Sequence, residues 1–122
     1  MIGLLDAGAD LNTFMWSGTA WSAVHTEHSS MTENAAAEMD FSIVFETSSS
    51  NPNDAWLVWN NTIGVSRRLW NGPTSAWQLA TSTGDDNNSI VLNAHPNNGA
   101  VLAGLYEDDT SATMGIREFH LT

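Results

Sequence analysis

The chain has no cysteine and no lysine, and Arg67, Arg68 and Arg117 are its only arginines. The absence of cysteine excludes disulfide bonds and thiolate metal sites. Fourteen Asp and Glu residues give a net charge of −11. Nucleic acids and anionic membrane surfaces are bound by clustered cations, so this composition argues against both as partners. No apolar run is long enough for membrane insertion, and the first residues have no basic segment, so we expect no signal peptide there.

The hydrophobic residues, 42% of the chain and including six Trp, occur in short segments. Gly, Asn, Ser, Thr and Asp separate these segments, a pattern typical of β-strands and turns. Residues 28–39 are polar and then Ala-rich, and are too short for more than one helical turn. Ten strands are predicted: Met1–Ala7, Asp10–Ser17, Ala20–His25, Phe41–Glu46, Ala55–Asn60, Val65–Trp70, Ala76–Ala80, Ile90–His95, Ala100–Tyr106 and Thr113–His120.

A tryptophan hairpin motif occurs twice. Its members are Trp16, Gly18 and Trp21 in the first copy, and Trp70, Gly72 and Trp77 in the second. The first tryptophans of the two copies are 54 positions apart and the second tryptophans are 56 apart. A repeat of roughly 50 residues is the signature of a propeller or another β-repeat array.

The order of the strands repeats as well. If one unit has strands A, B, C and D, residues 40–80 hold a complete unit, residues 1–25 hold B-C-D, and residues 89–122 hold A-B-C. We therefore predict one all-β domain over residues 1–122, built from four-stranded antiparallel blades. It would be part of a β-propeller that is completed by oligomerisation or by a longer chain. A β-sandwich is the alternative fold.

The whole pattern over residues 41–77 resembles the blade-type repeats of large bacterial and archaeal secreted or surface proteins. That resemblance implies a propeller-like fold and an extracellular or cell-surface location. The Trp hairpin also resembles, less closely, that of small fucose-binding propeller lectins, in which Arg and Glu accompany an aromatic ring around the sugar. Arg68 and Glu118 are of those types. The Asp box of sialidases is absent.

The tryptophans have two interpretations, as packing between sheets or as platforms for a sugar ring. Trp56 and Trp59 are three positions apart on one strand, so they point to opposite faces, and Trp59 is the better candidate for exposure. Arg67 and Arg68 also face opposite sides, and they either pair with carboxylates or help to bind a ligand. The candidate glycan site consists of Trp59, Arg68, Trp70 and Trp77.

Metal and catalytic signatures are weak. The acidic loops offer the calcium candidates Asp85, Asp86, Asp108 and Asp109, without the spacing of an EF-hand. His25 and His28 would share a metal only on a helix. There is no nucleophile elbow and no zinc-protease motif. We expect no cofactor and no enzyme activity.

The predicted function is a non-enzymatic extracellular structural or adhesive module that self-assembles as a homo-oligomer or polymer through its open strand edges. A carbohydrate-binding lectin is one alternative. A fragment of a larger propeller enzyme is the other.

Overall fold

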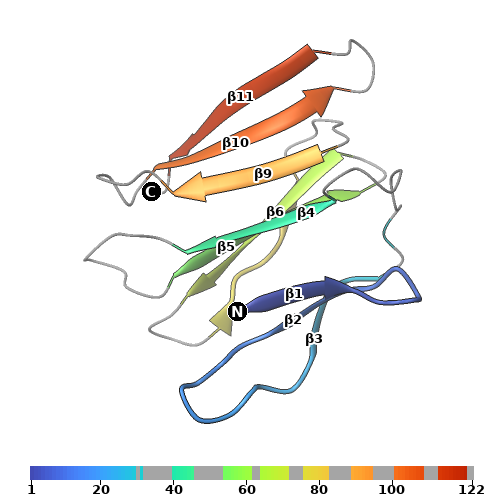
Figure 1. Cartoon of the computed structure of the whole chain (residues 1–122), viewed down its shortest axis with the longest axis vertical. Helices are drawn as coiled ribbons and strands as arrows, with labels where there is room; N and C mark the ends of the chain where they lie inside the picture. The colour runs from blue at the N-terminus through green and yellow to red at the C-terminus, as the bar shows by residue number, and fades with distance from the viewer. Residues whose placement is uncertain are drawn as a thin grey trace. The chain divides into compact units, whose positions relative to one another are not determined.

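A computed structural model describes residues 1–29, 31, 40–45, 54–61, 64–71, 76–82, 89–94, 101–108 and 113–120. The protein is all-β, as predicted, and the described residues contain no helix. The chain divides into two compact units, Met1–Glu33 and Asn34–Thr122. All strand pairs are antiparallel (Figure 1).

The N-terminal unit holds a three-stranded sheet in the order β1-β2-β3. The strands are β1 (Ile2–Leu5), β2 (Leu11–Phe14) and β3 (His25–His28). The β1–β2 ladder is regular, whereas the β2–β3 ladder shifts register between Leu11 and Asn12. Such an irregularity bends the strand and changes the direction of nearby side chains.

The second unit holds two sheets. The middle sheet has the order β4-β5-β6-β7, and β8 pairs with β6 beyond β7. Its strands are β4 (Phe41–Phe45), β5 (Ala55–Asn61), β6 (Gly64–Asn71), β7 (Ala76–Trp77) and β8 (Thr81–Ser82). The third sheet has the order β9-β10-β11. Its strands are β9 (Ser89–Ala94), β10 (Val101–Asp108) and β11 (Thr113–His120). The middle sheet therefore has the predicted complete A-B-C-D order, and the third sheet has A-B-C.

The strand register of the N-terminal sheet recurs in the middle sheet. Trp16 pairs with Trp21, and Trp70 pairs with Trp77. In each case the next backbone bond runs back across the hairpin, from Ser22 N to Met15 O and from Gln78 N to Leu69 O, both at 2.8 Å. The predicted repeat is thus present in the hydrogen-bonded backbone as well as in the residue types.

The bounds predicted for strand D are wrong in the first and second repeats. We expected single strands over Ala20–His25 and Ala76–Ala80, but each is split in two. In each hairpin a short first piece pairs at the second tryptophan, Trp21 or Trp77. The chain then leaves the sheet and pairs with it again four residues later, as β3 or β8. The residues between the pieces are exposed, with Val24 at 56% and Leu79 at 89%. Thr81–Ser82, which lies outside the predicted strands, is the second piece of the interrupted strand, and Ser89, also outside them, begins β9.

The core of the second unit lies between its two sheets. β9 contacts both β4 and β5, and Figure 1 shows β9 beside them. The buried side chains of the cluster are Val58, Val65, Ile90 and Leu92, with Val44 and Trp56 packed against them. Leu92 N donates a hydrogen bond of 3.0 Å to Ser42 Oγ across the interface. One face of the middle sheet, carrying Val44, Trp56 and Val58, therefore packs against the face of the third sheet that carries Ile90 and Leu92.

Candidate functional sites

The paired tryptophans close each hairpin. The ring centroids of Trp16 and Trp21 are 5.2 Å apart with planes tilted by 52°, and those of Trp70 and Trp77 are 5.5 Å apart and edge to face, at 71°. Direct cross-strand pairing brings such rings together, and these offset arrangements are the favourable ones. In both copies of the motif, the two tryptophans therefore lie opposite each other on paired strands. Gly18 lies in the first turn with φ +101°, a conformation that favours glycine. Gly72 lies outside the described residues.

The four candidate glycan residues share one face of the middle sheet. Leu57 pairs with Arg68, Ala55 pairs with Trp70, and Trp70 pairs with Trp77. Trp59 follows Leu57 by two positions on β5, so it points to the same side. The structure therefore places Trp59, Arg68, Trp70 and Trp77 on one face of the middle sheet, while their role in binding a sugar stays a prediction.

The expectation that Trp59 is the more exposed of the two β5 tryptophans is wrong. Trp59 is buried, with 2% of its surface exposed, whereas Trp56 is partly exposed. On the opposite face, the Arg67 guanidinium lies 5.6 Å from the Trp56 ring centroid, a cation–π geometry. The buried position of Trp59 leaves the half-buried rings of Trp70 and Trp77 as the aromatic surfaces of that candidate site.

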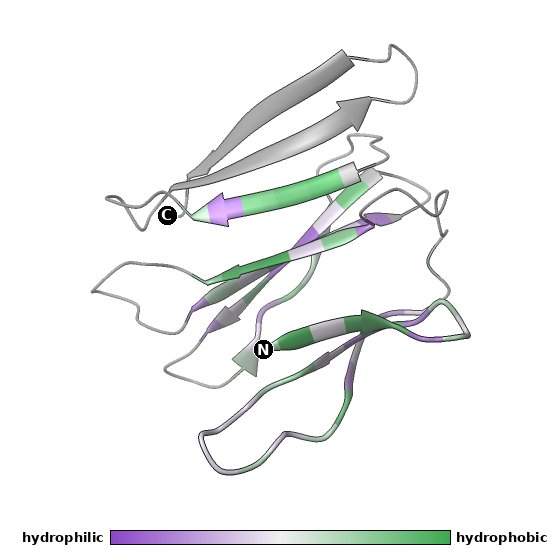
Figure 2. Cartoon of the chain, in the orientation of Figure 1, coloured by the Kyte–Doolittle hydropathy of each residue, from purple (hydrophilic) through white to green (hydrophobic). Residues whose placement is uncertain are grey.

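An exposed apolar face on the N-terminal sheet was not predicted from the sequence. Ile2 and Leu4 alternate on β1, and Trp16 and Trp21 extend the same face beyond β2. Their exposures are 48%, 39%, 48% and 50%. Figure 2 shows the strongly hydrophobic colouring of β1. The only earlier sign of this surface was the alternation of Ile2 and Leu4, which by itself does not tell a core face from an open one.

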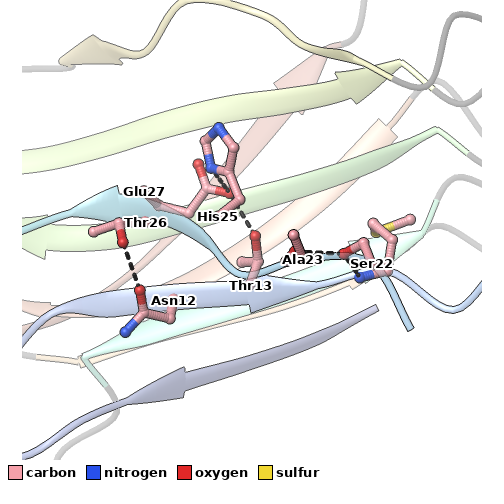
Figure 3. A network of polar contacts seen from close by, with 8 residues as sticks. Asn12, Thr13, Ser22, Ala23, His25, Thr26 and Glu27 are labelled. Carbon is pink, nitrogen blue, oxygen red and sulfur yellow. Dashed lines mark hydrogen bonds and ion pairs between the residues drawn. The ribbon is translucent and has the colours of Figure 1, made fainter.

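The opposite face of the N-terminal sheet carries a buried polar network (Figure 3). Thr13 Oγ1 donates a 2.6 Å hydrogen bond to Glu27 Oε1, and His25 Nδ1 lies 3.0 Å from the same oxygen. Thr13 and Glu27 are buried, while about half of the His25 side chain is exposed. His25 thus contacts a carboxylate, and His25 and His28 lie on strand β3 and not on the helix that a shared metal would have required. Sequence reasoning missed the network because Thr13 and Glu27 are far apart in the chain.

A second polar cluster shapes the loop between β1 and β2. The Asp6 carboxylate accepts hydrogen bonds from Gly8 N at 2.8 Å, Asp10 N at 3.1 Å and Asn12 Nδ2 at 3.0 Å. The backbone bond from Asp10, followed by that from Gly8, lowers the pKa of Asp6 below its usual value. Ala9, in the same loop, has φ +58°, in the left-handed region. This carboxylate therefore holds a turn that contains an unfavourable backbone conformation.

Of the calcium candidates, Asp108 ends β10, and Asp85, Asp86 and Asp109 lie outside the described residues. Within the described ranges, no group of three or more His, Asp or Glu side chains is arranged to hold a metal ion. No helix among those residues is long and apolar enough to cross a membrane.

A comparison of the chain with family models, curated proteins and solved structures finds no match. The strands, faces and side chains described above are therefore the basis for the functional proposals.

Proposed function

We propose that the protein is a structural or adhesive β-repeat module, without enzyme activity, that acts outside the cell by associating with further sheets of its own type. The observation that carries this proposal is the repeated strand register, combined with two sheets that have three described strands each where the middle sheet has the A-B-C-D order. Among the described residues, no strand stands in the N-terminal sheet at the position of β4 in the middle sheet, and none stands in the third sheet at the position of β7.

These two sheets leave strand edges available. In the described part of the chain, β1 pairs only with β2, and β11 pairs only with β10. The outer N–H and C=O groups of an edge strand favour pairing with another strand. A ring or a filament of several chains would satisfy both edges.

The acidic composition agrees with an exposed, soluble surface and with partners other than nucleic acid. The experiment that tests the proposal is the particle mass in solution, measured by light scattering over a range of protein concentrations. A discrete dimer or trimer supports a closed ring, and a large polydisperse mass supports a filament. A monomer at every concentration contradicts the proposal.

Carbohydrate binding is the second candidate, and the half-buried Trp70–Trp77 pair next to Arg68 favours it. Aromatic faces accept sugar rings by stacking, so binding would change tryptophan fluorescence. Titration with a series of monosaccharides tests this candidate, with Trp77→Ala as the variant that should lose the response. An unchanged spectrum with every sugar would contradict it.

A further inference from the structure

Two residues of the exposed apolar face of the N-terminal sheet, Ile2 and Leu4, have counterparts in the middle sheet that are fully buried. We place the counterparts by register: Ile2 pairs with Phe14, two residues before Trp16, and Leu57 pairs with Arg68, two residues before Trp70. By the same count, Leu4 corresponds to Trp59. Leu57 and Trp59 are 0% and 2% exposed, whereas Ile2 and Leu4 are 48% and 39% exposed.

The third sheet shows what covers a face of this type. In the sequence repeat, Ile90 and Leu92 of β9 correspond to Phe41 and Ile43 of β4. Phe41 and Ile43 pair with Trp59 and Leu57, so they lie on the same face as those two residues. Ile90 and Leu92 are buried against the opposite type of face, which carries Val44, Trp56 and Val58 of the middle sheet. Within the second unit, the face of the third sheet that corresponds to Ile2 and Leu4 is therefore covered by a neighbouring sheet, through the face that carries Val58.

We propose that the Ile2–Leu4–Trp16–Trp21 face binds a second copy of this chain, through the face of its third sheet opposite Ile90 and Leu92. This inference rests on the proposed self-association and names the surfaces that carry it. Val91 lies on that donor face, because it alternates with Ile90 and Leu92 along β9, and it is partly exposed. The contact would repeat the packing that the middle and third sheets already make within one chain.

Such a contact is heterologous, because two different surfaces of the chain meet head to tail. Heterologous contacts produce a ring where the rotation closes and a filament where it does not. Large exposed apolar surfaces are typical of interaction sites, since burying them removes hydrocarbon from water. The apolar acceptor face and the partly exposed Val91 make both ends of the chain suited to this contact.

The experiment uses the full chain with one charge added to either face. Leu4→Asp disables the acceptor face and Val91→Asp disables the donor face. Because an unpaired charge is costly to bury, each variant alone should associate at least about tenfold more weakly than the original chain in sedimentation velocity. Leu79→Asp is the matched control, because Leu79 is 89% exposed and lies on neither face. It should associate as the original chain does.

Mixing the two disabled variants gives the decisive measurement. Each retains one intact face, so an equimolar mixture should form 1:1 dimers and nothing larger, a result that misfolded chains cannot give. If Val91→Asp associates normally while Leu4→Asp does not, two N-terminal faces meet each other, and the head-to-tail inference is wrong. If both variants associate normally, the inference fails while the self-association proposal stands, with the strand edges as its basis. A monomeric original chain overturns both.

Discussion

At the scale of single residues, the Glu27 carboxylate is the shared partner in a polar network of the N-terminal sheet. It is buried, and it is held by the Thr13 hydroxyl and the His25 ring. Buried charged or polar groups are tolerated when they are hydrogen-bonded, and they become costly when a partner is removed. The network therefore fixes the point at which β3 rejoins β2.

Thr13→Val should destabilise the protein by about 1–3 kcal/mol, the usual cost of a lost hydrogen bond to a buried acidic group. The substitution keeps the shape of the side chain and removes only the donor to Glu27. Urea unfolding measures the change as a shift in midpoint.

Thr19→Val is the control for that variant, because the Thr19 hydroxyl contacts Ser17 Oγ at 3.3 Å and both residues are exposed, so water replaces the lost partner. We expect an effect within about 0.5 kcal/mol. Equal effects of the two substitutions would show that the buried hydrogen bond of Thr13 stabilises the protein no more than an exposed one.

The lowered pKa of Asp6 predicts that the folded protein loses stability at acidic pH. Its pKa in the folded protein is lowered by backbone hydrogen bonds from Asp10 and Gly8, so its ionised form stabilises the fold. That stabilisation is present above the unfolded pKa of about 3.9 and is lost as the pH falls through the lowered folded pKa. Asp6→Asn should therefore lower the urea midpoint at pH 7, and the difference from the original chain should narrow below pH 4. A difference that stays constant down to pH 3 would point to geometry and not to charge.

At the scale of the structural elements, the two hairpins contain the same cross-strand tryptophan pair in different surroundings. The Trp16–Trp21 pair is half exposed, and the Trp70–Trp77 pair is partly buried. Their ring separations are nevertheless similar, at 5.2 and 5.5 Å. The contact thus follows from the strand pairing within each hairpin.

Double-mutant cycles with alanine at both positions of a hairpin should give a coupling free energy of about 0.5–1.5 kcal/mol in each copy. The measurement is the urea unfolding of the original chain, the two single variants and the double variant. Trp56 and Trp77 lie on opposite faces of the middle sheet and provide the additive control pair. A coupling in one hairpin only would mean that surroundings, and not cross-strand pairing, hold the rings together.

Local patterns predicted the elements well where residue type alone decides the structure. β4, β5 and β6 follow the apolar, β-branched and aromatic segments within about one residue of the predicted bounds. The fourth strands were harder to predict, because they are interrupted by exposed residues such as Leu79, whose apolar character suggested a continuous strand. The short pieces depend on backbone bonds from Ser22 and Gln78 across the hairpins, and residue type does not encode these bonds.

For the candidate sites too, the sequence predicted the local arrangement of side chains but not their burial. Alternation along β5 correctly placed Trp56 and Trp59 on opposite faces, but it did not reveal which one is buried. Burial depends on which sheets pack together, and that is a property of the assembled fold. For the same reason, it could not be predicted from residue types that the face of Ile2 and Leu4 is exposed while Leu57 and Trp59, its counterparts in the middle sheet, are buried.

At the scale of the whole molecule, the middle sheet has buried apolar side chains on both faces. Val58 belongs to the cluster shared with β9, and Leu57 points to the other side and is 0% exposed. Leu57→Ala should therefore cost about 2–5 kcal/mol, because it leaves a cavity in packed surroundings. Leu79→Ala, at the exposed break in the fourth strand, should change the free energy of unfolding by less than about 0.5 kcal/mol. Similar urea midpoints for both variants would contradict the described burial.

The net charge of −11 sets the salt dependence of the proposed self-association. Copies of so acidic a chain repel one another, while the proposed contact between them is apolar. The screening length falls from about 30 Å at 0.01 M salt to about 3 Å at 1 M, so salt should weaken the repulsion and leave the hydrophobic contact intact. The average mass from light scattering should therefore rise between 0.01 and 1 M NaCl. Leu4→Asp should stay smaller than the original chain throughout that range, because screening does not restore the apolar contact. A mass that falls with salt would instead indicate that ion pairs hold the copies together.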